Sequence, residues 1–125
     1  MINTLNIGKY IYNTLTQSED ITCKVYPLVA DNDAKFPFII YKRVNLLSDV
    51  CKDGTYEDDV TVEVVVVTDK YSVGVEIANK VRELLEIQHI RYNDMEINDT
   101  KLVLATEEYN NGYVQRMQYQ MKINN

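Results

Sequence analysis

The stretch Val60-Thr61-Val62-Glu63-Val64-Val65-Val66-Val67-Thr68 is the strongest β-strand signal in this chain of 125 residues. Valine recurs at every second position, while Thr61 and Glu63 point to the other side. Such alternation is typical of a strand with one face in a core. Val65 and Val67 then extend apolar surface onto the second face.

A second β-rich segment precedes this strand. Residues 36–48 are rich in β-branched and aromatic side chains, and a polar loop around 48–57 separates the two segments. Within that loop, Lys52-Asp53-Gly54-Thr55 favours a turn, because Asp-Gly tolerates the positive φ angles that tight turns need. We therefore expect residues 36–48 and 56–68 to form one long antiparallel hairpin.

The remaining elements follow from periodicity. Residues 4–17 and about 72–86 have the apolar spacing of amphipathic helices, and Ser72 is the expected N-cap of the second. Pro27 makes the piece around it an edge strand or strand end, because proline cannot donate to a β-ladder. Further along the chain we expect a small hairpin, 89–92 with 95–97, and a strong one, 101–109 with 113–123.

The order helix, hairpin, helix, hairpin predicts an α+β fold. We expect an antiparallel β-sheet of four or more strands with two main helices packed on one face. The length predicts a single domain over residues 1–125. No apolar segment reaches the ~18 residues of a membrane helix, and the N-terminus does not resemble a signal peptide. We therefore expect a soluble intracellular protein without a membrane partner.

Charge and motif content argue against several functional classes. The formal charge is −6, and Lys42-Arg43 is the nearest approach to a basic run, which argues against sequence-specific nucleic-acid binding. The spacing of Cys23 and Cys51 matches neither a zinc site nor a dithiol redox motif, so inert thiols are expected. The scattered glycines form no phosphate-binding loop.

Two groups of polar residues could carry chemistry. His89 is the only histidine, and its place after a helix favours a surface or capping role over catalysis. Four acids surround the predicted turn without the spacing of a calcium loop, which favours a solvated loop: Asp53, Glu57, Asp58 and Asp59. We therefore predict no enzymatic activity, no cofactor and no metal.

Tyrosine is the outstanding feature of the composition, with ten residues against two phenylalanines and no tryptophan. A large apolar body with a polar tip suits a surface that meets another protein, although a tyrosine-rich sheet can also simply carry these side chains on its strands. The long hairpin could reach a neighbouring subunit as an arm. Its candidate interface residues are Leu46, Leu47, Asp49, Asp53, Tyr56 and Glu57.

Several segments together resemble a known family over nearly the whole chain. They are Ile7-Gly8-Lys9-Tyr10-Ile11, Val25-Tyr26-Pro27, Lys35-Phe36-Pro37-Phe38-Ile39-Ile40-Tyr41, Lys52-Asp53-Gly54, Val60-Thr61-Val62-Glu63-Val64, Thr68-Asp69-Lys70-Tyr71, Ala78-Asn79-Lys80-Val81-Arg82-Glu83-Leu84-Leu85, Glu107-Glu108-Tyr109 and Tyr113-Val114-Gln115. This set resembles the tail-completion (tail-terminator, head–tail joining) proteins of tailed bacteriophages and prophages. The chain departs from that family at Ile21-Thr22-Cys23-Lys24, where a turn containing Gly or Asp is common.

The resemblance implies a structural subunit that assembles with itself into a ring, often a hexamer. Such a ring caps the tail tube, so the implied partners are the tail-tube protein and the head–tail connector proteins. The implied location is the host bacterial cytoplasm during assembly and then the tail or neck of the virion. The family brings no catalytic residue. Two other readings stay open: an oligomeric adaptor that holds a protein partner by a sheet edge or tyrosine-rich surface, and a small enzyme acting through His89.

Overall fold

The computed structural model describes residues 4–50, 52–54 and 56–124, and strands dominate it. Two helices and six strands follow a short 3-10 turn. In chain order these are η1 (Thr4–Asn6), α1 (Ile7–Thr16), β1 (Lys24–Pro27), β2 (Phe38–Val50), β3 (Tyr56–Thr68), α2 (Tyr71–Leu85), β4 (His89–Tyr92), β5 (Met95–Tyr109) and β6 (Tyr113–Asn124).

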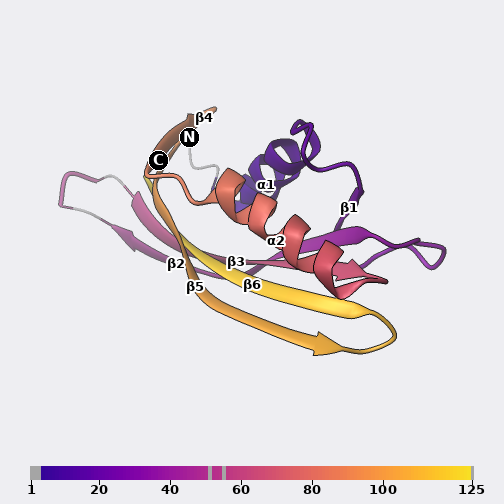
Figure 1. The fold of residues 1–125 in the computed structure, drawn as a ribbon. Helices are drawn as coiled ribbons and strands as arrows, with labels where there is room; N and C mark the ends of the chain where they lie inside the picture. Colours follow the sequence, from indigo (N-terminus) through magenta and orange to yellow (C-terminus); the bar gives the residue numbers. More distant parts are fainter. Residues whose placement is uncertain (1–3, 51, 55, 125) are drawn as a thin grey trace.

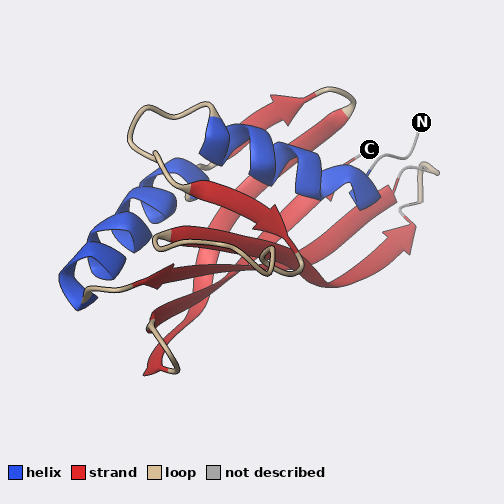
Figure 2. Ribbon diagram, turned by 90° about the vertical axis from the view of Figure 1, so that its right-hand side faces the viewer, coloured by secondary structure: helices blue, strands red, loops and turns tan. Residues whose placement is uncertain are grey.

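All six strands belong to one sheet, in the order β1-β2-β3-β6-β5-β4. β1 runs parallel to β2, and every other neighbouring pair is antiparallel. The long strands twist and bend, so that the sheet curls like half of a barrel (Figures 1 and 2). β4 lies at the upturned end of this curl (Figure 1).

The fold class expected from the sequence is therefore wrong. The sheet is mixed rather than antiparallel, because the chain crosses over between β1 and β2 and returns in the same direction. The helices do not form a layer packed on one face of a flat sheet. The short α1 contacts β1 and β2, whereas α2 contacts β3 and β6, at a different part of the curl.

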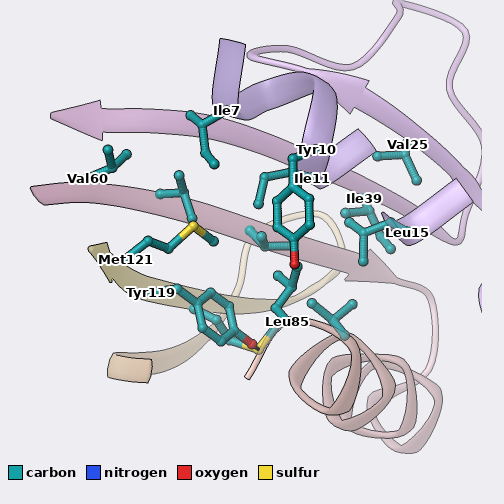
Figure 3. Packing of buried hydrophobic residues seen from close by; sticks show 14 of the residues in the cluster. Ile7, Tyr10, Ile11, Leu15, Val25, Ile39, Val60, Leu85, Tyr119 and Met121 are labelled. Atoms are coloured by element: carbon teal, nitrogen blue, oxygen red, sulfur yellow. Dashed lines mark hydrogen bonds between the residues drawn. The ribbon is translucent and has the colours of Figure 1, made fainter. Parts of the chain in front are cut away.

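The core lies between the curled sheet and the two helices. The valines at alternate positions of β3 are buried, as the sequence predicts. Figure 3 shows Tyr10 and Ile11 of α1, Leu85 of α2 and Tyr119 of β6 in this core. Tyr10 and Tyr119 are among the largest fully buried side chains, so tyrosine serves the interior of this protein as well as its surface.

The two long hairpins are confirmed, and they point in opposite directions (Figure 1). The strands of the first extend to Val50 and from Tyr56, so its connection is shorter than the predicted loop over 48–57. Gly54 adopts a φ of 85°, the left-handed conformation that the Asp-Gly pair predicts. At the turn of the second hairpin, a Cβ on Gly112 would lie 2.9 Å from the ring of Phe36.

Two local expectations are corrected. Residues 95–97 and 101–109 belong to one strand, β5, because register shifts after Asn98 and Leu102 absorb the extra residues. The helix expected over about 72–86 is confirmed as α2, but its N-cap is Lys70 rather than Ser72. The hydroxyl of Thr68 donates to the Lys70 carbonyl at 2.7 Å, which fixes the entry into the helix.

Candidate assembly surfaces

The first candidate surface is the outer edge of β2. β1 covers this strand only from Phe38 to Tyr41. The amide of Leu28 then donates to the Tyr41 carbonyl at 2.9 Å and ends the covered part. Among the described residues, no strand pairs with the outer side of β2 over 42–50, a segment we call the β2 edge. Leu47 is 69% exposed on it, which makes an apolar, unpaired edge.

The second candidate surface is the outer edge of β5, on the far side of the same sheet. β4 covers only the first residues of β5, through Asn98. The carboxylate of Glu86 accepts the Leu102 amide at 2.9 Å and ends the covered part. Within the described part of the chain, nothing pairs with the outer side over 103–109, which we call the β5 edge. Leu104 is 50% exposed and Tyr109 69%.

The two edges carry opposite charges, at the start of the β2 edge and near the end of the β5 edge. Lys42 and Arg43 open the β2 edge, while Glu107 and Glu108 lie near the end of the β5 edge. Unpaired strand edges are templates for another chain, and natural proteins usually blunt them. Here each strand has only its first residues covered, so a long uncovered segment remains on both sides of the sheet.

An apolar hollow of about 340 Å³ adjoins the start of the β2 edge. It lies between the beginning of α1, the end of β1 and the strand β2. Its lining includes Leu5, Gly8, Leu28, Tyr41 and Arg43. Leu5 and Leu28 are exposed at its rim, and the guanidinium of Arg43 donates to the Leu5 carbonyl at 3.2 Å.

A tyrosine cluster lies at the turn of the β5–β6 hairpin. The rings of Tyr71 and Tyr109 both pack edge-on against Tyr113. Glu107 accepts hydrogen bonds from the Gln115 amide and the Tyr71 hydroxyl, each at 2.8 Å. These hydrogen bonds lower the pKa of Glu107, and the carboxylate in turn raises the pKa of Tyr71. The cluster fixes the end of β5 and leaves Tyr109 exposed.

The sheet face that turns away from the core carries a charged cluster. Glu63 alternates with the buried valines of β3 and points to this face. Its carboxylate accepts from Arg116 at 3.3 Å and from Gln118 at 3.1 Å, and Lys42 lies 4.0 Å away. Arg116 also reaches Glu108 at 2.8 Å, and these carboxylates raise its pKa. Charge is therefore balanced locally on this face.

Comparison with known proteins identifies the fold. No protein-family model matches the chain, and no curated protein matches it. A solved structure does: a chain of the virion of a native gene transfer agent (GTA) particle, with a TM-score of 0.79 at 10% sequence identity. The match covers 92% of this chain and 92% of that chain. The two chains share one fold over nearly their whole length.

The interface residues predicted from the sequence lie along the outer half of the β2–β3 hairpin. Leu47 and Asp49 are exposed on the β2 edge, and Leu46 is half-buried against the core. Asp53 is exposed in the turn and Glu57 lies half-buried on β3. The side chain of Tyr56 lies outside what the structure describes. The hairpin brings these residues to one end of the molecule.

Sequence reasoning missed the β5 edge. Residues 101–109 were expected to form an ordinary hairpin strand, and no pattern in them shows which side lacks a neighbour. The run Leu102-Val103-Leu104 interrupts the alternation of a half-solvated strand, which indicates an irregularity but not which side is open. Its cause is the bulge between Leu102 and Leu104.

The structure also describes most of the other candidates predicted from the sequence. His89, on β4, is held between Asn98 at 2.9 Å and Glu96 at 3.5 Å. Of the predicted acidic loop, Asp58 is buried, which the expectation of a solvated loop did not include. In the described ranges, no three His, Cys, Asp or Glu side chains gather as metal ligands. Cys23 is half-buried and burial raises its pKa, whereas Cys51 lies outside the described residues. No helix in the described ranges is long and apolar enough to cross a membrane.

Proposed function

We propose that this protein is a structural subunit of a phage-like virion, and within it a tail-completion protein that assembles into a ring. Three observations support the proposal. The sequence resembles tail-completion proteins along most of its length, and the fold is shared with a chain of a gene transfer agent virion. In addition, β2 and β5 each have an uncovered segment beyond the short strands β1 and β4, within the described residues. The uncovered strands are the observation that carries it.

The uncovered strands favour assembly because of where they lie. They flank opposite sides of one sheet, so one copy can offer its β2 edge while receiving a neighbour at its β5 edge. A contact between two different surfaces is heterologous, and repeated heterologous contacts close into a ring when the rotation permits. Such a ring would cap the tail tube and meet the tail-tube and head–tail connector proteins at its two faces.

Negative-stain electron microscopy of the purified protein tests this function. We expect closed rings of uniform size, with about six subunits as the resemblance implies. Removing the hairpin turn over 52–54 and shortening the arm should abolish the rings while circular dichroism stays unchanged. A firm dimer with paired sheet edges would instead favour the adaptor that holds a protein partner. Unchanged rings after shortening would show that the hairpin end is not part of the contact.

A further inference from the structure

We propose that the β2 edge of one copy pairs antiparallel with the β5 edge of the next, so that the sheets of neighbouring copies become continuous. The inference rests on the proposed function, because it supplies the subunit contact of the ring. It commits to a second copy of this chain as the occupant of both edges. Backbone phase, side-chain charge and the apolar hollow each support it.

On both edges, the residues whose side chains point to the core turn their backbone N–H and C=O groups outward. On β2, the Tyr41 carbonyl accepts the amide of Leu28, so core-side residues turn their backbone groups outward. On β5, the outward amide belongs to Leu102, whose side chain packs against the core. β2 has one register shift, between Arg43 and Asn45, and beyond Leu102 β5 has one, between Leu102 and Leu104. A classic bulge adds one residue without exchanging the two faces beyond it, so core-side residues remain the outward-facing ones.

In one register, residues of the same face lie opposite one another and oppositely charged side chains also meet. It places Lys42 opposite Glu108 on the outer face and Arg43 opposite Glu107 on the core side. With the bulge after Arg43, the same register brings Leu47 opposite Leu104, where the uncovered part of β5 begins. Sliding the strands by two residues places Lys42 opposite Thr106 or Asn110 and loses the charge pairs. Opposite charges at facing positions stabilise antiparallel pairs, and like charges destabilise them.

In the same register, Tyr109 of the neighbouring copy fills the apolar hollow beside α1. Tyr109 is the next residue after Glu107 that points to the core side. In the proposed register, Tyr109 of the neighbouring copy lies opposite Tyr41. Tyr41 lines the hollow of about 340 Å³ beside α1. The phenol ring of Tyr109, 69% exposed in the single chain, would be buried there. The exposed leucines Leu5 and Leu28 at the rim would pack on it.

The pairing also constrains the assembly geometry. Within one sheet, Lys42 faces Glu63, which faces Gln118, which in turn faces Leu104. Lys42 and Leu104 of one chain therefore lie at the same height in the sheet. The neighbour must therefore slide by four residues, about 13 Å at the usual rise per residue. A constant offset between strands is what tilted strands in a closed barrel require. The contact thus suits a ring whose strands are tilted against its axis.

Cysteine cross-linking tests the pairing. In a Cys23→Ala/Cys51→Ser background, one protein carries Leu47→Cys and the other Leu104→Cys, and the two are mixed under oxidised glutathione. Facing residues without hydrogen bonds between them are close enough for a disulfide. We expect a covalent dimer in the mixture and none in either protein alone. A chain with both cysteines should give a ladder that ends at the ring size.

The matched control replaces Leu104→Cys by Ala105→Cys, the next residue, which points to the other face. We expect its dimer band to be lost. A dimer of Leu47→Cys alone would overturn the proposal in favour of two β2 edges in contact. Rings without the cross-link would overturn this pairing but leave the proposed function standing. A cross-linked species that grows as open filaments would keep the pairing and reject the ring.

Discussion

Arg116 and Glu63 form an ion pair of 3.3 Å on the sheet face that turns away from the core. Glu63 is buried, although it belongs to the strand that supplies the valines of the interior. Its carboxylate is satisfied by Arg116 and Gln118, so the central strand can carry a charge at a covered position. The pair links β3 to β6, the two strands in the middle of the sheet.

Removing the arginine should destabilise the fold. Arg116→Ala leaves the buried carboxylate with weaker partners, and we expect a loss of about 1–3 kcal/mol in the free energy of unfolding. Lys80→Ala is the matched control, because it breaks the exposed pair with Glu76 and should cost less than about 0.5 kcal/mol. Urea unfolding of both variants measures the difference. Equal losses would contradict a stabilising role for the buried pair.

Tyr119 should be an interior residue whose ring matters more than its hydroxyl. It is fully buried, and its hydroxyl donates to the Met117 sulfur, a weak acceptor, at 3.3 Å. Tyr119→Ala should cost about 3–5 kcal/mol of stability through the cavity that it leaves. Tyr119→Phe should cost about 1 kcal/mol or less. Thermal unfolding of the two variants distinguishes them, and equal destabilisation would show that the hydroxyl is essential.

Glu107 should titrate below an ordinary glutamate. Hydrogen bonds from Gln115 and Tyr71 lower its pKa in the folded state, relative to the usual value of 4.5. The stabilisation is therefore present above that usual value and is lost as the pH falls through the folded pKa. Carbon NMR of the carboxyl should show the lowered pKa, and Gln115→Ala should raise it. A titration that Gln115→Ala leaves unchanged would contradict this assignment.

The proposed register predicts a charge-swap rescue between copies. Lys42→Glu and Glu108→Lys should each weaken assembly, because each places like charges opposite one another in the contact. The double variant restores opposite charges and should recover assembly, with less effect at high salt. Analytical ultracentrifugation measures the assembled fraction. If the double variant assembles no better than the two single ones, Lys42 and Glu108 do not face each other.

The local elements could be predicted where periodicity is strong, and their pairing could not. β3 and α2 were predicted because valine alternates in one and apolar residues recur at helical spacing in the other. The parallel partner of β2 was missed, since four residues around Pro27 carry no information on direction. Residues 98–100 were expected to separate two hairpins, yet they form an irregularity within one long strand.

Of the two candidate surfaces, only the one on the β2–β3 hairpin could be predicted from the sequence. The hairpin indicated an arm, which led to Leu47 and Asp49. Whether a strand is uncovered depends on how far its neighbour extends, and this is decided by the short strands β1 and β4. The sequence pattern of β5 therefore could not show that Leu104 and Tyr109 lie on an open edge.

Molar mass in solution, measured by light scattering over a wide concentration range, tests the central claim most directly. For the wild type we predict a species near six times the single-chain mass of 14.5 kDa. Leu47→Asp, on the β2 edge, should give single chains. Asn79→Asp, which adds the same negative charge at an exposed position of α2 away from both edges, should assemble like the wild type. A wild type that stays at one or two chains at every concentration, or a Leu47→Asp variant that still forms the large species, would contradict the account.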